Sequence, residues 1–503
     1  MEILPEPSAF EAAYDAGRAQ LVYTRLVADL ETPVSALLKL ARGEAMSFLF
    51  ESVEGGATRG RYSFIGMKPD LIWRCFGTRA EINRDARTRA DAFTPCDEPT
   101  LDSLRALVAE SRLDVPEGLA PMAAGLFGYM GYDTVRLMEH LPDNNPDTLG
   151  VPDGMFLRPT LVAVFDNIED VVTLVTPVWP SQDMKAADGL ASAHERLADA
   201  VAALAMPLDH SLTTSAEAPP APVPVSNTTR ERYHEMVAKA KDYIAAGDIF
   251  QVVPSQRFSV PFTLPSIALY RALRRLNPSP FLFHLDFGAF SVVGSSPEIL
   301  VRLRDGTVTI RPIAGTRPRG QTAGEDKQME DDLLADPKEL AEHLMLLDLG
   351  RNDVGRVART GTVKVTEQFV IERYSHVMHI VSNVEGQIKD GEDAISALVA
   401  GFPAGTVSGA PKVRAMEIID ELEIARRGIY GGAVGYFAAN GAMDTCIALR
   451  TAVIKDGTMY VQAGGGVVAD SDAEAEYQES CNKARALIRA AEEAVKFAAR
   501  DTS

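Results

Sequence analysis

Two glutamate pairs, each with a spacing of three residues, are the side chains of this sequence best suited to hold a hard cation. Glu339 and Glu342 lie in "DPKELAEHLMLLDLGRND", and Glu476 and Glu479 lie in "AEYQESCNKAR". Residues three apart on a helix are neighbours on one face. If the two pairs converge, they offer oxygen ligands without His or Cys, a set that suits Mg²⁺ better than zinc or copper.

Each pair also has a simpler interpretation as part of a solvated helix face. For the first pair, apolar residues on both sides of the helix, such as Leu344 and Leu346, predict burial. A buried carboxylate needs a cation or a hydrogen-bond donor. For the second pair, Lys483 follows Glu479 by four residues, so an exposed ion pair would explain the spacing. The sequence leaves open whether the four carboxylates meet.

One arginine and two histidines stand in predicted strands, where a polar side chain needs an explanation. Arg450 lies in the apolar run "TCIALRTAVI", and a buried arginine requires a carboxylate partner from the protein or from a ligand. His376 and His379 lie in "RYSHVMHIVS", and residues three apart on a strand face opposite sides. Only one of the two histidines can therefore line a given cleft, and a purely structural role is the alternative.

The segment "RPIAGTRPRG", residues 311–320, places three arginines around two prolines, two glycines and a threonine. This composition predicts a loop at the exit of a strand, suited to meet an anion. Ala314 is a small inert side chain at a point where a reactive or charged group would be expected.

Composition and charge exclude several classes of protein. Lys and Arg number 50 and Asp and Glu 70, so the formal charge is −20, which repels nucleic acid and anionic membranes. The segment "GTVSGAPK" lacks the GK[ST] of a phosphate loop. The four cysteines have no CxxC spacing, which predicts reduced thiols. Without a signal-peptide pattern or an apolar run of membrane-spanning length, we expect a cytoplasmic location.

The elements expected to position these residues follow an α+β pattern. Residues 1–206 alternate between extended and helical patterns, and residues 207–229, rich in Pro, Ser and Thr, predict a linker. In residues 230–496, predicted hairpins, one of them at Asp305-Gly306, are interrupted by helices without a regular βαβ alternation. This order predicts antiparallel sheets with helices packed on the outside.

Eight motifs then appear in order along the chain: "PIAGTRPRG", "ELAEHLMLLDLGRND", "RYSHVMH", "GTVSGAPKVRAME", "YGGAVGYF", "DTCIALRTA", "VQAGGGVVADS" and "AEYQESCNKAR". The chain on this basis resembles the component I family of anthranilate synthases, within the chorismate-utilising enzymes. The resemblance covers about residues 230–490 closely and the N-terminal half more loosely. It implies a sandwich of antiparallel sheets with outer helices, Mg²⁺ as cofactor, and the conversion of chorismate and ammonia to anthranilate and pyruvate, the first committed step of tryptophan biosynthesis.

Position by position, the resemblance implies the functional residues. Mg²⁺ would be held by Glu342 and Glu479, with Glu339 and Glu476 supporting it through water. The enolpyruvyl carboxylate of chorismate would contact Tyr430, Arg450, Lys483 and the backbone of Gly464 and Gly466. The ring would contact Gly315, Thr316, His379 and Thr406. Glu298 would protonate the leaving 4-hydroxyl, for which it needs a raised pKa. His379 would assist the loss of pyruvate.

Two positions discriminate among related reactions. Gln251 would place ammonia where isochorismate synthases carry a lysine base, and glutamine cannot deprotonate water. Ala314 stands where relatives that make aminodeoxychorismate often carry lysine, so alanine disfavours component I of aminodeoxychorismate synthase, the nearest alternative. A regulatory subunit with a decayed catalytic site is disfavoured because competent residues fill every position.

The resemblance also implies a partner and an inhibitor. No cysteine lies in a GxCxG-type nucleophile turn, so a separate glutamine amidotransferase, component II, would deliver ammonia within a heterotetramer. L-Tryptophan would bind a site built from Glu51 and Ser52 in "FLFES" and from Pro280, Phe281 and Leu282 in "NPSPFLF". Glu51 suits the α-ammonium group, and apolar neighbours suit the indole. A hydrophobic strand packed on a proline turn is the alternative. Residues 1–206 would then be regulatory, and residues 230–496 would be the chorismate-binding catalytic region.

Overall fold

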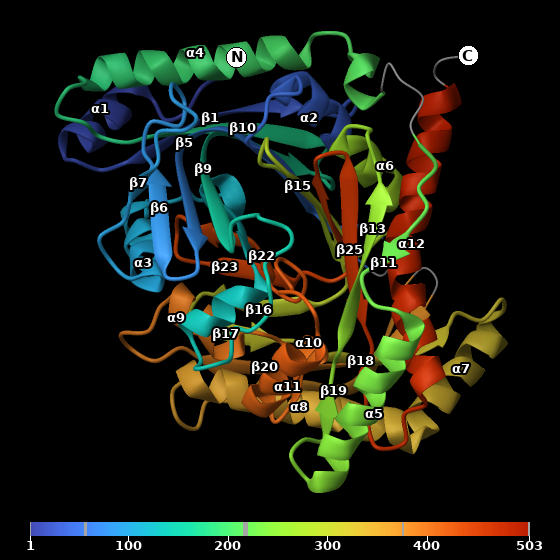
Figure 1. The fold of residues 1–503 in the computed structure, drawn as a ribbon. Helices are drawn as coiled ribbons and strands as arrows, with labels where there is room; N and C mark the ends of the chain where they lie inside the picture. Colours follow the sequence, from blue (N-terminus) through green and yellow to red (C-terminus); the bar gives the residue numbers. More distant parts are fainter. Residues whose placement is uncertain (1, 55–57, 215–219, 375–376, 501–503) are drawn as a thin grey trace.

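The computed structural model describes residues 2–54, 58–214, 220–374 and 377–500, which form helices around a large central β-structure (Figure 1). The α-helices are α1 (Pro7–Asp15), α2 (Pro33–Ala41), α3 (Thr100–Glu110), α4 (Ala186–Leu204), α5 (Arg230–Ala246), α6 (Ser266–Leu276), α7 (Ala323–Ala335), α8 (Pro337–Val357), α9 (Ala394–Gly401), α10 (Gly405–Ser408), α11 (Lys412–Leu422) and α12 (Ala473–Arg500). Short 3₁₀ turns are η1 (Pro121–Ala123), η2 (Tyr132–Leu137) and η3 (His210–Thr213).

The strands of the first half are β1 (Gln20–Val27), β2 (Ser47–Glu51), β3 (Val53–Glu54), β4 (Thr58–Arg59), β5 (Tyr62–Phe76), β6 (Arg79–Asn83), β7 (Thr94–Pro95), β8 (Gly125–Met130), β9 (Gly154–Asp166) and β10 (Val171–Val178). Those of the second half are β11 (Val225–Ser226), β12 (Gln251–Val252), β13 (Ser255–Pro261), β14 (Phe281–Asp286), β15 (Ser291–Ser296), β16 (Ile299–Arg304), β17 (Thr307–Ile310), β18 (Ile313–Pro318), β19 (Lys364–Arg373), β20 (Val377–Gln387), β21 (Gly409–Ala410), β22 (Ala433–Ala438), β23 (Met443–Ile447), β24 (Thr451–Lys455) and β25 (Thr458–Gly464).

Twenty-one of these strands are joined by hydrogen bonds into one antiparallel system that divides at the long strand β9. One arm runs from β9 through β5, β2, β14, β15, β24 and β25 to β13. The other arm runs from β9 through β8, β22, β23, β16 and β17 to β20, which also pairs with β18 and β19.

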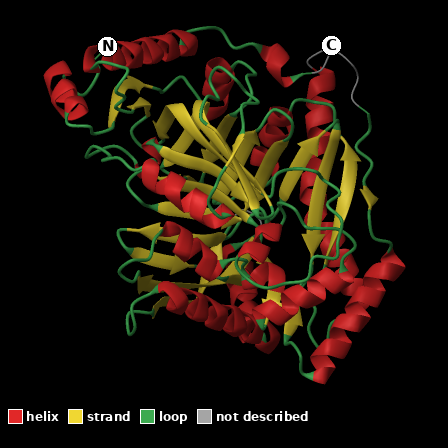
Figure 2. Cartoon of the chain, turned by 60° about the vertical axis from the view of Figure 1, so that its left-hand side comes forward, coloured by secondary structure: helices red, strands yellow, loops and turns green. Residues whose placement is uncertain are grey.

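The two arms pack face to face, which confirms the predicted sandwich. One hydrophobic cluster combines Phe283 and Val292 of the first arm with Phe127 and Val434 of the second. A second cluster joins the outer face of the first arm to α2, α4, α6 and α12. A third joins the outer face of the other arm to α3, α8 and α9. Figure 2 shows this order of layers, with strands inside and helices outside.

The predicted hairpins are confirmed where a turn signal separates two apolar runs. Asp305 and Gly306 both have positive φ, 48° and 74°, between the paired strands β16 and β17. The segments "ANGAMD" and "KDGT" likewise connect β22 to β23 and β24 to β25. Local turn chemistry therefore fixes these pairings.

The two halves of the chain share the central β-structure. Strand β2 pairs with β14, and β8 pairs with β22. The predicted linker, residues 207–229, is more ordered than expected at its end, because β11 pairs with β13; residues 215–219 lie outside the described residues. The linker therefore does not separate two independent sheets.

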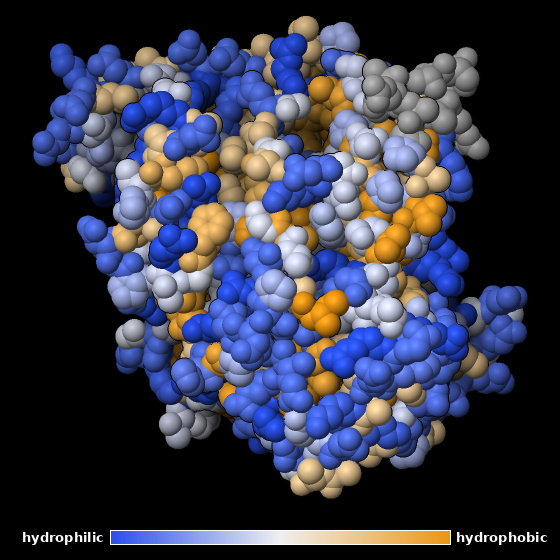
Figure 3. All heavy atoms as spheres, in the orientation of Figure 1, coloured by the Kyte–Doolittle hydropathy of each residue, from blue (hydrophilic) through white to orange (hydrophobic). Residues whose placement is uncertain are grey.

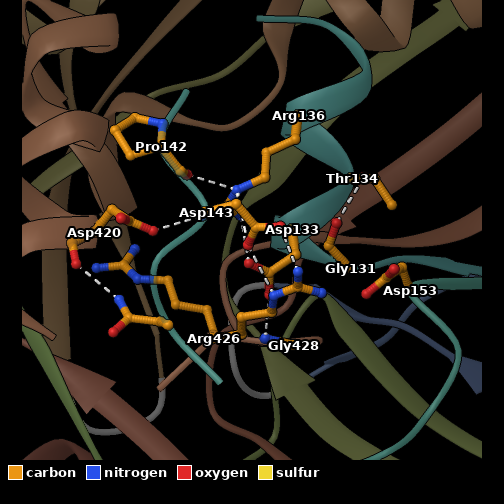
Figure 4. Close-up of polar contacts among 12 residues, drawn as sticks. Gly131, Asp133, Thr134, Arg136, Pro142, Asp143, Asp153, Asp420, Arg426 and Gly428 are labelled. Carbon is orange, nitrogen blue, oxygen red and sulfur yellow. Dashed lines mark hydrogen bonds and ion pairs between the residues drawn. The ribbon is translucent and has the colours of Figure 1, made fainter. Parts of the chain in front are cut away.

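A polar cluster, shown in Figure 4, also ties the halves together. Arg136 donates to Asp133 and to Asp420 at 2.6 and 2.7 Å. The backbone N–H of Gly428 donates to the second oxygen of Asp133 at 2.7 Å. Asp420 and Gly428 flank the segment that leads to Tyr430, so residues from the first half support a predicted substrate-binding residue of the second.

The surface agrees with the acidic composition. The face in Figure 3 is mainly hydrophilic, with small separate hydrophobic areas. Among the described helices, none is both long and apolar enough to cross a membrane.

Candidate active site

Glu298, between β15 and β16, is a buried carboxyl group suited to carry a proton. Its Oε1 accepts a hydrogen bond of 2.8 Å from Thr406 Oγ1. Burial raises the pKa of Glu298 to about 8, although the bonds from Thr406 and from the backbone at Ile313 act in the opposite direction. Glu298 therefore holds its proton at neutral pH, as a general acid requires.

His379 on β20 is held as a neutral imidazole. Its Nδ1 lies 2.9 Å from the carbonyl oxygen of Gly315 and 3.1 Å from Thr316 Oγ1. Because a carbonyl only accepts, we assign the ring proton to Nδ1, which leaves Nε2 with its lone pair. Burial lowers the pKa of His379. The ring is therefore ready to accept a proton, and His376 lies outside the described residues.

The segment 311–320 differs from the expected loop. Residues 313–318 form strand β18, which pairs with β20 and is irregular between Ala314 and Thr316. Gly315 has φ +70°, a conformation that L side chains rarely adopt. The irregularity brings the Gly315 carbonyl to His379. Sequence composition missed the strand because its pairing depends on a distant partner.

The arginines of this segment bind protein carboxylates. Arg317 pairs with Asp332, Asp336 and Glu339, Arg319 with Asp326, and Arg311 with Glu367 and Glu372. Their positive charge is thus neutralised within the fold. The arginines therefore fix the segment within the fold, and the expectation of an anion site built from them is wrong.

Gln251 on β12 lies beside the first glutamate pair. Its Nε2 donates a 3.1 Å hydrogen bond to Glu342 Oε1. Its Oε1 is buried and has no hydrogen-bond partner among the described residues. A Cβ on Gly466 would stand 2.3 Å from Gln251 Nε2, so the glycine makes room for the amide. The free amide oxygen can accept a hydrogen bond from a small donor such as ammonia.

The glutamates on α8 and α12 influence one another electrostatically. Burial raises the pKa of Glu342, and the negative charges of Glu339 and Glu479 raise it further. Burial also raises the pKa of Glu476, again with a contribution from Glu479. The two helices therefore bring carboxylates from distant parts of the chain near one another. The sequence alone had left this question open.

The carboxylates are nevertheless held apart by other partners. Lys483 Nζ pairs with Glu479 at 2.7 Å, Arg317 with Glu339 at 3.1 Å, and Ser471 Oγ donates to Glu476 at 2.7 Å. Across the described ranges, no three His, Cys, Asp or Glu side chains come close enough to hold a metal ion together. Side-chain movement is required before these groups share one cation.

The donor set still fits a hard divalent cation. Glu476 is buried, and its Oε2 has no hydrogen-bond partner within the described part of the chain. A Cβ on Gly465 would lie 2.8 Å from this oxygen, so the glycine leaves space beside it. An unsatisfied buried carboxylate oxygen beside other repelling carboxylates is what a cation would stabilise.

The prediction that apolar residues on both sides of the helix bury the first glutamate pair is wrong. Leu344 is 54% exposed, so α8 is not buried on all sides. Glu342 is half-buried because its own face of α8 lies near Gln251, not because the whole helix is enclosed. For the second pair, both interpretations hold in part, since Glu476 is buried while Glu479 forms a half-exposed ion pair.

A second group of polar residues is suited to bind a carboxylate. Arg450 does not lie in a strand as predicted but in the connection between β23 and β24, with φ 47°. Burial lowers the pKa of Arg450, whose side chain has no hydrogen bond or ion pair among the described residues. The Tyr430 hydroxyl faces the backbone of Gly464, whose carbonyl accepts a 3.0 Å bond from Lys483. Arg450 is therefore the cation here that still lacks an anion among these residues.

A buried ion pair that the sequence pattern did not predict connects three site segments. Arg427 pairs with Glu423 at 2.7 Å and donates to the carbonyl oxygens of Val407 and Val253, both at 2.6 Å. These carbonyls lie next to the segments that carry Thr406 and Gln251. The available signal was the pair of opposite charges four residues apart, Glu423 and Arg427, in "ELEIARRGIYGG".

The segments predicted to bind tryptophan lie side by side. Leu282 on β14 stands opposite Glu51 on β2. A cavity of about 780 Å³ is lined by Glu51, Ser52, Pro280 and Phe281, together with Phe50. Leu282 does not line it, because its side chain packs into the hydrophobic cluster with the outer helices.

Glu51 is not available in the expected way. Its carboxylate accepts hydrogen bonds from Arg274 at 2.6 and 2.8 Å and from the Tyr270 hydroxyl at 2.5 Å. An incoming ammonium group would have to share a carboxylate that is already satisfied. The predicted direct role of Glu51 is therefore disfavoured, whereas Ser52 remains half-buried at the cavity wall.

Comparisons with known proteins agree on one family. The sequence profile of the family described as chorismate binding enzyme matches residues 53–489. Anthranilate synthase component 1 of Cereibacter sphaeroides is 63% identical over 494 residues, covering 98% of each chain. That of Pseudomonas putida is 50% identical over 469 residues, covering 92% of this chain and 93% of the relative. The crystal structure of anthranilate synthase component I from Streptococcus pneumoniae TIGR4 matches with a TM-score of 0.75 and 36% identity, covering 85% of this chain and 92% of that one.

Proposed function

The chain belongs to the chorismate-binding enzymes, among the component 1 proteins of anthranilate synthase, and from this premise we propose that it converts chorismate and ammonia to anthranilate, pyruvate and water. The observation that carries the reaction type is Glu298, a buried acid whose pKa is raised to about 8 and whose carboxyl group meets the backbone of β18, the strand that also holds the neutral base His379. The two groups supply an acid and a base at neutral pH.

Substrate binding is assigned to the residues around Arg450, whose charge is unmatched among the described residues. Arg450 would pair with the enolpyruvyl carboxylate, assisted by Tyr430, Lys483 and the backbone of Gly464 and Gly466. Gly315 and Thr316 would contact the ring beside His379, and Thr406 would contact it beside Glu298. The half-buried position of Arg450 supports this assignment, because a guanidinium partly removed from water gains from an ionic partner.

In the first step, the proton of Glu298 goes to the 4-hydroxyl of chorismate, which leaves as water. Ammonia, hydrogen-bonded to the free Oε1 of Gln251, forms the new bond to ring carbon 2. The ring double bonds shift as the C4–O bond breaks, so electrons balance without an oxidant. Ammonia loses one proton as it becomes the amino group, which restores the proton on the enzyme.

In the second step, Nε2 of His379 removes the hydrogen from ring carbon 2. The bond between ring carbon 3 and the enolpyruvyl oxygen breaks, and the ring becomes aromatic. The released enolpyruvate takes up a proton and becomes pyruvate. The Nδ1–H bond to Gly315 supports this role, because it directs the basic nitrogen away from the backbone.

We assign Mg²⁺ to Glu342 and Glu479, with Glu339 and Glu476 supporting it through water. When bound, the ion would neutralise the ring carboxylate of chorismate and withdraw electrons from the ring as a Lewis acid. The all-oxygen donor set and the unsatisfied Oε2 of Glu476 support this assignment.

The alternative, synthesis of aminodeoxychorismate, is not favoured. Ala314 has no amine that could attack the ring, and the relatives compared above are named anthranilate synthase. Incubating the purified chain with chorismate, Mg²⁺ and ammonium separates the two, because anthranilate is fluorescent and aminodeoxychorismate retains the enolpyruvyl group. Aminodeoxychorismate without anthranilate would refute the proposed reaction.

The name component 1 of the relatives supports a second subunit that supplies ammonia from glutamine. The four cysteines are free, and Cys75 and Cys446 are buried, which supports neither a glutaminase nucleophile here nor an oxidising compartment. We propose a complex with a glutamine amidotransferase, a heterotetramer, in the cytoplasm. The purified chain should use ammonium but not glutamine, and glutamine-dependent activity of the chain alone would contradict this.

For residues 1–206 we propose a regulatory role, with L-tryptophan bound in the cavity beside Ser52, Pro280 and Phe281. The cavity lies between strands of the two halves, which supports a ligand that bridges them. Residues 230–496 would form the chorismate-binding catalytic region.

A further inference from the structure

His379 is held from two directions, and the function proposed above explains only one of them. Its Nδ1 faces the Gly315 carbonyl at 2.9 Å, which fixes the edge of the ring. The ring also makes a T-shaped, edge-to-face contact with the ring of Tyr374, with ring centroids 5.5 Å apart and planes at 64°. Contacts with Gly315 and Thr316 at this one nitrogen still allow the imidazole to tilt, so the aromatic contact removes the remaining freedom.

Hydrogen bonds hold both the backbone and the side-chain hydroxyl of Tyr374. Its backbone N–H donates to the carbonyl of Val377 at 2.8 Å, and its own carbonyl accepts from Arg319 Nη1 at 2.7 Å. Its hydroxyl donates to Glu372 Oε2 at 2.8 Å. The side chain is buried, so these contacts are not exchanged with water.

Glu372 is held in turn by Arg311. The two side chains form an ion pair, and Arg311 also pairs with Glu367 at 2.8 Å. Glu372 stands opposite His379 in the pairing of β19 with β20. Arg311 therefore holds Glu372, Glu372 holds the hydroxyl of Tyr374, and the ring of Tyr374 contacts the imidazole.

Proton transfer is not the role of this tyrosine. Burial and the neighbouring carboxylate of Glu372 raise the pKa of Tyr374, so the phenol keeps its proton at neutral pH. Its hydroxyl already donates to Glu372 rather than toward His379. Tyr374 instead provides a fixed aromatic ring against which His379 packs.

We propose that Tyr374 is a positioning residue that holds the His379 imidazole in the orientation needed to take the proton from ring carbon 2, and that Glu372 and Arg311 hold Tyr374. The inference rests on the proposed function, because it concerns the second of its two steps. It separates that step from the amination, which depends on Glu298 and Gln251.

The test compares chorismate consumed with anthranilate formed, in the wild type, Tyr374→Phe and Tyr374→Leu. The wild type should give one anthranilate per chorismate. Tyr374→Phe removes the hydroxyl that donates to Glu372, and Tyr374→Leu removes the aromatic ring that contacts His379. Each variant should therefore release the aminated, non-aromatic intermediate, which is detected by mass spectrometry. In Tyr374→Leu the rate of anthranilate formation should fall by up to about 100-fold, more than chorismate consumption does.

The control is Tyr243→Phe, which removes a hydroxyl that donates to Glu421 at 2.6 Å on the exposed surface. It should leave rate and product ratio unchanged. Anthranilate formation that keeps pace with chorismate consumption in both Tyr374 variants overturns the inference. If Tyr374→Leu does not fold, the ratio in Tyr374→Phe decides. Absence of anthranilate from the wild type would instead refute the proposed function.

Discussion

Glu298 is the side chain whose proton matters most to the proposed chemistry. Burial raises its pKa to about 8, so the protonated form predominates at pH 7 and is lost as the pH rises through 8. We expect kcat/KM for ammonia-dependent anthranilate formation, measured at constant free ammonia, to fall about tenfold per pH unit above about pH 8. Glu298→Gln should lower the rate by at least about 100-fold at every pH.

Thr406→Val provides a matched test of the same carboxyl group. The threonine hydroxyl donates to Glu298 and stabilises its ionised form, so its removal should move the alkaline limb to higher pH. A limb that stays in place in Thr406→Val, or an active Glu298→Gln variant, would exclude Glu298 as the acid.

The four glutamates carry the second prediction. Glu342→Gln and Glu479→Gln each remove a proposed Mg²⁺ ligand, so turnover should fall by at least about 100-fold while the circular dichroism spectrum is retained. The rate is measured across a Mg²⁺ titration.

Glu417→Gln is the control, because Glu417 pairs with Arg414 on the half-exposed surface of α11. Its rate should equal that of the wild type at each Mg²⁺ concentration. Full activity of Glu342→Gln or Glu479→Gln at limiting Mg²⁺ would exclude the proposed Mg²⁺ site.

For single residues, the sequence predicted which side chains belong to the candidate site better than it predicted the contacts of each side chain. The family resemblance implied roles for Glu298, His379 and Gln251, and the structure gives each a suitable neighbour. It did not predict that Arg274 and Tyr270 satisfy Glu51, because these partners lie more than 200 positions away. Contacts between residues so far apart in the chain produce no periodic pattern in the sequence.

Among the structural elements, the Arg427–Glu423 pair joins the segments around Gln251, Thr406 and Tyr430. Arg427→Met would leave Glu423 buried without its cation and two carbonyls without a donor. The free energy of unfolding should fall by about 3–5 kcal/mol, measured by urea denaturation.

The comparison is Lys496→Met, which breaks an exposed pair with Glu493 at 3.3 Å. That change should cost no more than about 1 kcal/mol. Equal effects of the two substitutions would show that the buried pair does not hold these segments together.

Elements defined by local signals were predicted, and those defined by distant pairing were not. The hairpins at Asp305-Gly306 and "KDGT" follow from turn residues between apolar runs. Strand β18 was taken for a loop because the segment 311–320 contains two prolines and two glycines, although β20 supplies the hydrogen bonds of the strand. The exposed Leu344 shows the opposite error, in which apolar spacing overstated burial.

At the level of the complete chain, the cavity of about 780 Å³ connects the two halves. Ser52 and Phe281 line one part of it, and Glu372 and Tyr374 line another, so a ligand here would also contact the residues that hold His379. Tryptophan should therefore inhibit ammonia-dependent turnover. Ser52→Phe fills the cavity and should raise the half-inhibitory concentration by at least about tenfold, or about 1.4 kcal/mol of binding free energy.

Ser396→Phe is the matched control, because Ser396 lines a separate cavity of about 530 Å³. It should remain as sensitive to tryptophan as the wild type. A wild-type rate and chorismate affinity that do not change at saturating tryptophan would exclude this regulatory site, since coupling between two sites must be reciprocal.

Product stoichiometry is the decisive measurement for the proposed reaction. The purified chain is incubated with chorismate, Mg²⁺ and ammonium, and anthranilate, pyruvate and remaining chorismate are quantified in the same sample. We expect one anthranilate and one pyruvate for each chorismate consumed. Chorismate consumption without pyruvate, or pyruvate without anthranilate, would contradict the assignment.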